Sequence, residues 1–259
     1  MDVLEIQELC ERGQAQLMRM EYLEAEETLA SAEHAAWAGR HWDAISRLYL
    51  PLQEARRQRR QRCGEGVVCL DRLADGPDDD LDPRHVIENY PHGQLLVAGW
   101  GSIAPAVALR QLQARHGLYV ETFLGAVFPV TPAGVGDARR VVVVAPQDGT
   151  MLPAPDEQPL DELARKLPSG CLVLPVGELP KGSRAGTSET YGEVMALWER
   201  LHRPLLAAAD READPIRRIE GYRTAIRVDY ACELAHQKLS DVARQLGRQS
   251  QQGGSALSI

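Results

Sequence analysis

The sequence has no apolar run long enough to cross a bilayer, so we expect no membrane-spanning helix. Its beginning, MDVLEIQELCERG, carries acids where a signal peptide needs a basic and then an apolar segment. Positive charge is also scarce, because 29 Lys and Arg face 37 Asp and Glu, a formal charge of -8. We therefore expect a cytoplasmic protein with no membrane contact and no general affinity for nucleic acid.

Cysteine is sparse, and its spacing suggests no shared chemistry. The five residues are Cys10, Cys63, Cys69, Cys171 and Cys232. Only Cys63 and Cys69 are near each other, and their spacing fits neither a zinc knuckle nor a CxxC redox pair. The seven histidines do not pair at metal-ligand spacing on one helix face. We expect reduced, mostly buried thiols, no metal site and no cofactor.

The clearest local pattern is QLLVAGWGSIAPAVALRQLQARHGLYVETFL. Its apolar run, 95–98, is followed by Gly99 and Gly101, and glycine tolerates the backbone angles of a tight turn. Ser102 is placed to cap a helix by accepting a bond from a first-turn amide. That helix is expected to end at Gly117, where a β-prone run begins. Strand, helix and strand in this order predict a parallel pair with a right-handed crossover.

The middle of the chain, 64–189, continues this alternation and predicts an α/β domain of Rossmann-like layout. Strands are expected at 66–73, 95–98, 119–127, 140–145 and 171–176, short helices at 83–90 and 160–167, and a glycine-rich connection at 131–138. The run RVVVVA at 140–145 suits a strand that is buried on both faces. We predict a layered, mostly parallel sheet of about five strands.

The first part of the chain, 1–63, is helical by composition and period. Gly13 in a first helix, followed by Ala25, Leu29 and Ala32 in a second, has the spacing at which small residues meet between two antiparallel helices. This pattern resembles the tetratricopeptide repeat. The resemblance implies a stacked helical hairpin that binds a protein or peptide partner in a groove, with no chemistry of its own.

The chain is expected to be helical again over 190–248. Thr190 and Glu193 are spaced as a capping box at its start. Within it, Tyr222, Ala225, His236, Leu239 and Ala243 resemble the same repeat family. We infer that the two helical segments pack on each other or on the sheet domain. The last residues, 249–259, are low in core formers and are predicted to be a disordered tail.

Two loops of the α/β domain could bind a phosphorylated ligand. The turn at Gly99, Gly101 and Ser102 fits the G-x-G-x-x-[GA] fingerprint, and Glu121 lies near the interval of the acid that binds a ribose. The loop 181–188 offers cations and hydroxyls, from which the candidate ligands are Lys181, Ser183 and Arg184. In a parallel sheet both loops would lie at the carboxyl edge. A tight structural turn and a solvated loop are the alternatives.

Two charge clusters have similar alternatives. The aspartates Asp71, Asp75, Asp78, Asp79, Asp80 and Asp82 could bind a hard cation or form a solvated acidic loop. The arginines Arg56, Arg57, Arg59, Arg60 and Arg62 could bind nucleic acid or an acidic partner, or form an exposed helix face or pair with the acidic loop.

We therefore expect an interaction protein with tetratricopeptide-like helices on both sides of an α/β domain, and a protein or peptide partner. The alternative is binding of a nucleotide or another phosphorylated small molecule, with or without catalysis, at Gly99, Gly101, Ser102, Lys181, Ser183 and Arg184. No Ser, His and acid triad or nucleophile elbow can be identified, so no catalytic residue is assigned.

Overall fold

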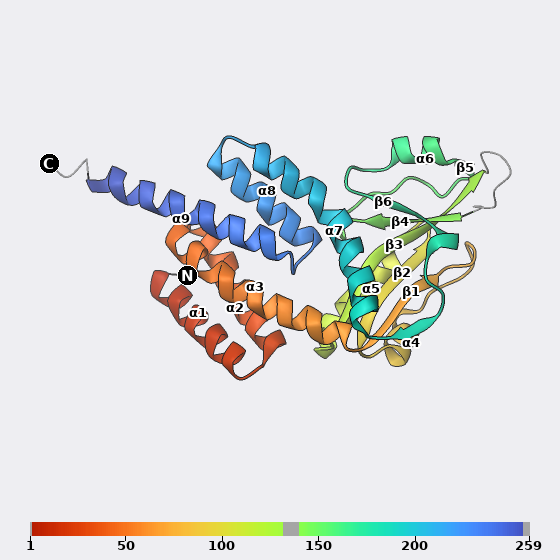
Figure 1. The fold of residues 1–259 in the computed structure, drawn as a ribbon, viewed down its shortest axis with the longest axis horizontal. Coiled ribbons are helices and arrows are strands. Elements are labelled where there is room, and N and C mark those ends of the chain that lie inside the picture. Colours follow the sequence, from red (N-terminus) through yellow and green to blue (C-terminus); the bar gives the residue numbers. More distant parts are fainter. Residues whose placement is uncertain (1, 132–139, 256–259) are drawn as a thin grey trace. The chain divides into compact units, whose positions relative to one another are not determined.

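The computed structural model describes residues 2–131 and 140–255, with side chains as far as residue 250. The glycine-rich connection expected at 131–138 therefore lies, except for its first residue, outside the described part. The chain forms two compact units: a helical unit, Met1–Arg59 with His202–Ile259, and a sheet unit, Arg60–Leu201 (Figure 1). In the described ranges, no helix has the length and apolar character that crossing a bilayer requires.

The helical unit is built from helices at both ends of the sequence. They are α1 (Val3–Met18), α2 (Tyr22–Ala38), α3 (Trp42–Gly64), α7 (Ser188–Arg211), α8 (Pro215–Val228) and α9 (Glu233–Ser255). The boundaries between the two units fall inside α3, after Arg59, and inside α7, after Leu201. Capping defines the starts: Asp2 and Glu5 form a capping box on α1, and Asp214 accepts a bond from the first turn of α8.

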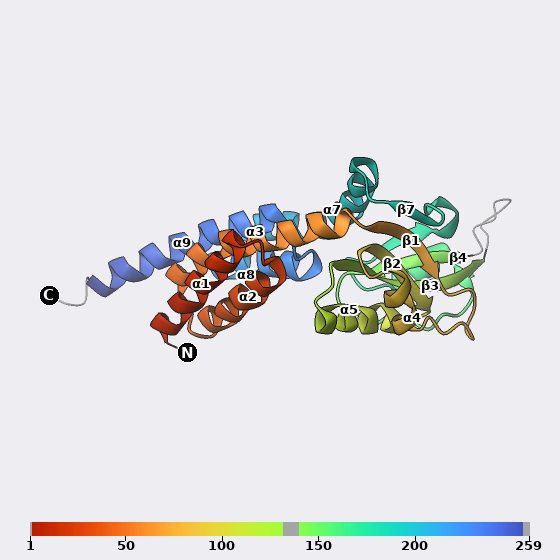
Figure 2. The ribbon, with the colours of Figure 1, turned by 90° about the horizontal axis from the view of Figure 1, so that it is seen from below.

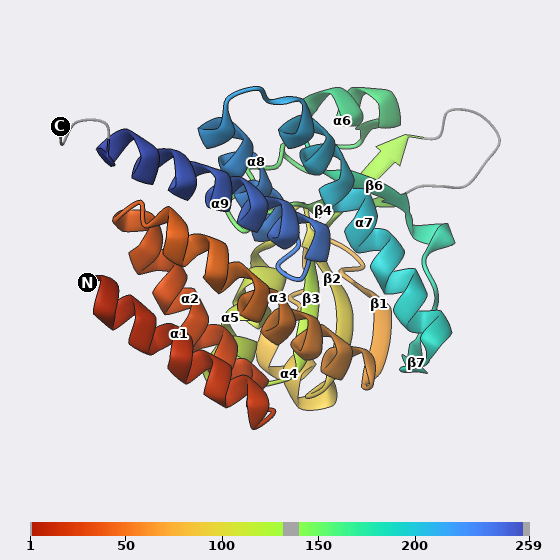
Figure 3. The same ribbon diagram turned by 60° about the vertical axis from the view of Figure 1, so that its left-hand side comes forward.

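One core joins the N-terminal and C-terminal helices, so the two helical segments do pack on each other. It includes Ile6, Leu29, Leu48, Ile219, Tyr222 and Leu239. Helices α1 and α2 lie antiparallel and side by side (Figure 3). They approach closely at Gly13, where an added Cβ would lie 2.5 Å from Leu29 Cγ, so only glycine fits without a shift of the leucine.

The sheet unit contains a mixed sheet in the order β6-β4-β3-β2-β1-β7, with β5 paired to β3. The strands are β1 (Val67–Leu73), β2 (Gly93–Trp100), β3 (Val120–Thr131), β4 (Arg140–Ala145), β5 (Gln158–Pro159), β6 (Leu172–Pro175) and β7 (Ser183–Ala185). The helices are α4 (Pro83–Asn89), α5 (Ala104–His116) and α6 (Leu160–Lys166), with a 3-10 turn η1 (Val176–Glu178).

An α/β fold with flanking helices is present, but the prediction of a mostly parallel sheet of about five strands is not met. Seven strands form the sheet in the part of the chain that the structure describes. In the described residues, the pairs β1–β2, β2–β3 and β3–β5 are parallel, whereas β1–β7, β3–β4 and β4–β6 are antiparallel. The chain between β3 and β4, 132–139, is shorter than the dozen or so residues that a parallel crossover needs, so this pair is antiparallel.

Each face of the sheet is covered by helix. Helices α4 and α5 lie together on one face (Figure 2), where Leu95, Leu124 and Leu109 belong to a single apolar cluster. On the other face, the ring of Phe123 stacks on Trp198 of α7, with 4.2 Å between the ring centroids. Burial on both faces explains the nearly continuous apolar character of β2, β3 and β4.

Three helix ends differ from their sequence predictions. Helix α5 begins at Ala104 with Ile103 in the cap position, although the Ser102 hydroxyl accepts a bond from the Ala104 amide at 3.1 Å. Helix α7 begins before the expected capping box: Thr187 and Thr190 exchange amide-to-hydroxyl bonds of 2.9 and 3.3 Å. Helix α9 continues to Ser255, past the predicted start of the disordered tail at 249, and 256–259 lie outside the described residues.

Candidate functional site

The turn after β2 uses its own amides within the fold. The Gly101 amide donates to the carbonyl of Val127 at 2.8 Å, and the Ser102 amide points to the carbonyl of Gly99 at 3.5 Å. Gly101 has a φ of +59°, and an added Cβ there would lie 2.5 Å from Cγ of Pro155. The turn therefore needs glycine for its backbone and for contact with Pro155, and the Gly101 amide is not directed at a phosphate.

Glu121 is likewise engaged in the core of the sheet unit. Its Oε1 accepts two bonds from Arg60, at 2.9 and 2.6 Å, and its Oε2 accepts one from Gln94 at 2.7 Å. All three side chains are buried. The carboxylate that the fingerprint would assign to a ribose thus forms a buried ion pair with the end of α3.

The loop 181–188 is partly a strand, and its polar residues contact the fold. Arg184 pairs with Glu193 of α7 at 3.0 Å, and the Ser183 hydroxyl lies 3.0 Å from the Tyr90 hydroxyl. The Arg184 guanidinium lowers the pKa of the Glu193 carboxyl through their hydrogen bond. Lys181 is exposed. The side chains of Ser183 and Arg184 thus attach β7 to neighbouring elements.

The two loops do not lie at the same place along the sheet. Ser183 is opposite Cys69 in β1, and Cys69 is opposite Leu95 in β2, several residues before Gly99. Strand β1 also separates β7 from β2. The expected meeting at one carboxyl edge required a parallel strand before the loop 181–188, whereas β7 is itself the edge strand and runs antiparallel to β1.

The acidic loop is mostly exposed, as a solvated loop would be. Asp71 accepts a bond from the Gly182 amide at 2.7 Å, Asp82 caps α4, and Asp75 pairs with Arg140 at 3.3 Å. These contacts are within the sheet unit and hold its loops.

The arginine run on α3 is only partly the exposed helix face that the sequence favoured: Arg57 is partly exposed and Arg62 exposed, whereas Arg56 and Arg60 are buried. Arg56 and Arg59 pair with Glu26 of α2 at 3.3 and 2.8 Å. Burial raises the pKa of Glu26, but the charges of Arg59 and Arg56 outweigh it, so the pKa lies below its ordinary value. Their partners are carboxylates of α2 rather than those of the acidic loop.

This buried charge network extends from α2 and α3 to α8. Glu33 accepts a bond from the Tyr49 hydroxyl, which in turn accepts one from Trp37 Nε1 at 3.0 Å. Arg223 of α8 lies 3.8 Å from Glu33 and over the ring of Trp37, 4.4 Å from its centroid. Burial, followed by the charge of Glu33, raises the pKa of Tyr49. Polar contacts between α2, α3 and α8 thus add to the apolar packing that joins these helices.

His236 of α9 completes the network as a neutral residue. It is fully buried, with Arg56 Nη1 3.1 Å from its Nε2 and the Cys232 carbonyl 2.8 Å from its Nδ1. Burial, and then the charge of Arg56, lower the pKa of His236 to about 3. Because an arginine can only donate, Nε2 is the acceptor and Nδ1 carries the proton.

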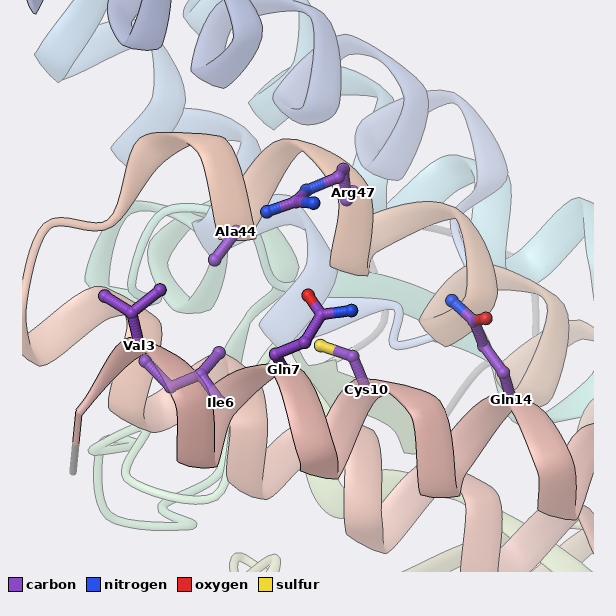
Figure 4. A pocket seen from close by; sticks show the side chains of 7 residues that line it. All are labelled: Val3, Ile6, Gln7, Cys10, Gln14, Ala44 and Arg47. Atoms are coloured by element: carbon purple, nitrogen blue, oxygen red, sulfur yellow. The ribbon is translucent and has the colours of Figure 1, made fainter.

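A small cavity lies between α1 and α3 (Figure 4). Its volume is about 70 Å³, and it is lined by Val3, Ile6, Gln7, Cys10, Gln14, Ala44 and Arg47. The lining residues of α1 recur at three- and four-residue intervals, so they lie on one face of the helix. Burial raises the pKa of the Cys10 thiol, which favours its neutral form. The cavity therefore joins an apolar floor to amide and guanidinium groups.

Sequence reasoning did not single out this cavity. Gln7, Cys10 and Arg47 have no distinctive spacing as a set, because α1 and α3 are separated in sequence by the whole of α2. The resemblance to a helical repeat predicted a groove but not its lining residues.

No family model, curated protein or solved structure matches the chain, so its function is inferred from the local contacts described above.

Proposed function

We propose that this is an interaction protein whose helical unit binds a protein or peptide partner. In this proposal, α1 and α2 form a tetratricopeptide-like hairpin on which α3 stacks, and the partner lies on the face shared by α1 and α3. The cavity between those two helices is the observation that supports it (Figure 4).

The lining defines the chemistry of the partner. A volume of about 70 Å³ accommodates a small aliphatic side chain, since one water occupies about 30 Å³ in the liquid. Gln7 and Gln14 are exposed at the cavity and can pair with a peptide backbone, and the exposed Arg47 can pair with a carboxylate. We therefore expect a short segment with an aliphatic side chain next to an acidic group. Val3, which lines the cavity, is exposed and adds apolar surface to the site.

Binding of a phosphorylated ligand by the sheet unit has less support than partner binding by the helical unit. The Gly101 amide, Glu121 and Arg184 already have partners within the fold. We therefore assign partner binding to the helical unit and no second function to the sheet.

A displayed peptide library selected on the purified full-length chain tests the proposal. Selected peptides should share the aliphatic and acidic pattern. Arg47→Glu should weaken their binding at least about tenfold, which corresponds to about 1.4 kcal/mol, because it opposes the peptide carboxylate. Arg12→Glu is the matched control: it reverses an exposed arginine of α1 that does not line the cavity, and it should leave affinity within about twofold.

A second variant tests the cavity itself. Cys10→Met adds volume to the lining while remaining apolar, so it should exclude the aliphatic side chain and weaken binding. Selected peptides that bind wild type, Arg47→Glu and Cys10→Met equally well would rule out this site.

A further inference from the structure

Three side chains with metal-binding atoms meet where α7, α8 and α9 come together. His202 is on α7, and Asp229 and Cys232 are in the turn that joins α8 to α9. In the part of the chain that the structure describes, this is the one group of three or more such residues whose ligand atoms all lie within 4.8 Å of one another. All three belong to the helical unit.

The cluster is largely shielded from water. His202 Nδ1 lies 2.6 Å from Asp229 Oδ2, and the exposed fractions of the two side chains are 13% and 0%. Cys232 is also buried. A donor set of one imidazole, one carboxylate and one thiol in a dry site is therefore in place, and His202 is its most accessible member.

The turn holds its two donors by backbone contacts. The second carboxylate oxygen of Asp229 accepts a bond from the Ala231 amide at 3.2 Å, and the Cys232 amide donates to the Asp229 carbonyl at 3.0 Å. The Cys232 carbonyl in turn accepts a bond from His236 at 2.8 Å. Such outer contacts orient ligands in protein metal sites.

A buried histidine–carboxylate pair alone is the simpler interpretation. Burial lowers the pKa of His202, but its hydrogen bonds to Asp229 and Cys232, together with their charges, outweigh this and raise the pKa to about 9. The Cys232 side chain also hydrogen-bonds to this imidazole and packs in the core of the helical unit, so His202 contacts both of the other donors. A metal ion accounts for all three donors.

We propose that His202, Asp229 and Cys232 form a binding site for a divalent zinc ion. Nitrogen, oxygen and sulfur donors together suit zinc, whose bonds of about 2.0 to 2.3 Å place tetrahedral donors roughly 3.3 to 3.7 Å apart. The observed separations bracket this range, from 2.6 Å to at most 4.8 Å, so small side-chain rotations are sufficient. On binding, the Cys232 thiol and the His202 imidazolium each give up one proton to solvent, and a water takes the fourth position. The ion would connect α7 to the α8–α9 turn.

The test uses the full chain without a histidine tag, stripped with a chelator and then titrated with Co²⁺ as a spectroscopic substitute for zinc. One equivalent should give tetrahedral d–d bands and a thiolate-to-cobalt charge-transfer band. Zn²⁺ should displace the cobalt, and should raise Tm by about 5 °C at a hundredfold excess over Kd.

Variants identify the ligands. Cys232→Ser, which is nearly isosteric, should abolish the charge-transfer band, and His202→Gln should weaken Co²⁺ affinity at least about tenfold. Cys171→Ser is the control, because it removes a half-buried thiol of the sheet unit and should leave the spectrum unchanged. Absence of stoichiometric Co²⁺ binding by the folded wild type would overturn the proposal. So would a charge-transfer band that survives in Cys232→Ser.

Discussion

Replacing Glu121 with glutamine removes one charge from a deeply buried ion pair of the sheet unit. The side chains of Arg60 and Glu121 are only 2% and 3% exposed. Glu121→Gln keeps the shape and one accepting oxygen, but it leaves the Arg60 guanidinium in the core without the countercharge of Glu121. Loss of one partner of a buried pair typically costs about 3 to 5 kcal/mol, and we expect that cost here.

A surface ion pair provides the reference for this loss of stability. Arg57 and Glu54 are 38% and 44% exposed, and Glu54→Gln should cost less than about 1 kcal/mol because water screens the charge. A double change, Arg60→Met with Glu121→Leu, removes both buried charges. It should cost less than Glu121→Gln alone, since neither charge of the pair is then buried without the other.

Urea unfolding followed by tryptophan fluorescence measures these differences. The Arg60 guanidinium lies 4.8 Å from the ring centroid of Trp198, so this indole should report on the pair. A loss below about 1 kcal/mol for Glu121→Gln would refute the reasoning, since it would equate the pair with a surface one. A double variant less stable than the single variant would refute it as well.

Three further changes test other contacts. The contribution of His236 to stability should be complete above pH 6.5 and fall towards pH 3, by about 2 kcal/mol at pH 5, because the unfolded chain protonates this residue while the fold keeps it neutral. The pH dependence of the urea midpoint between pH 6.5 and 5 should therefore be weaker in His236→Gln. Gly101→Ala should cost about 1 to 3 kcal/mol in thermal unfolding, because it strains the turn and meets Pro155, whereas Gly149→Ala should be nearly neutral. Arg184→Ala should cost less than about 1 kcal/mol in urea, because its pair with Glu193 is partly exposed.

The sequence predicted helices and strands well where the hydrophobic period agrees with the glycine and proline residues that bound a segment. The unit β2–α5–β3 is present, its strands pair in parallel, and α5 ends at Gly117 in the left-handed conformation. Apolar runs bounded by glycine and proline likewise located β1, β4 and β6. These features depend on local backbone preferences, which a single sequence records directly.

Strand direction and the shortest strands were not predictable in this way. An apolar run such as β4 has the same composition whether its neighbour is parallel or antiparallel. The strand β7, Ser183–Ala185, is too short and too polar to show a period, so its residues were read as a loop. Its pairing depends on β1, which is more than a hundred residues earlier in the chain.

The roles of the charged residues were the hardest to predict, because their partners are distant in sequence. The arginines of α3 have the pattern of a solvated face, yet Arg56 and Arg60 are buried against Glu26 and Glu121. The zinc-ligand candidates show the same difficulty: only Asp229 and Cys232 are close in sequence, and α7 supplies His202. Contacts between residues so distant in sequence can be identified only from the tertiary structure.

The location of these buried charges separates stability from binding in the helical unit. Glu26, Glu33 and Arg56 join α2, α3 and α8 from within, whereas Gln7 and Arg47 are exposed at the cavity between α1 and α3. A change at Arg47 should therefore alter partner affinity with little effect on unfolding, whereas a change at Glu33 should do the reverse. If Arg47→Glu unfolded the unit, the cavity face would be part of the core rather than a binding surface.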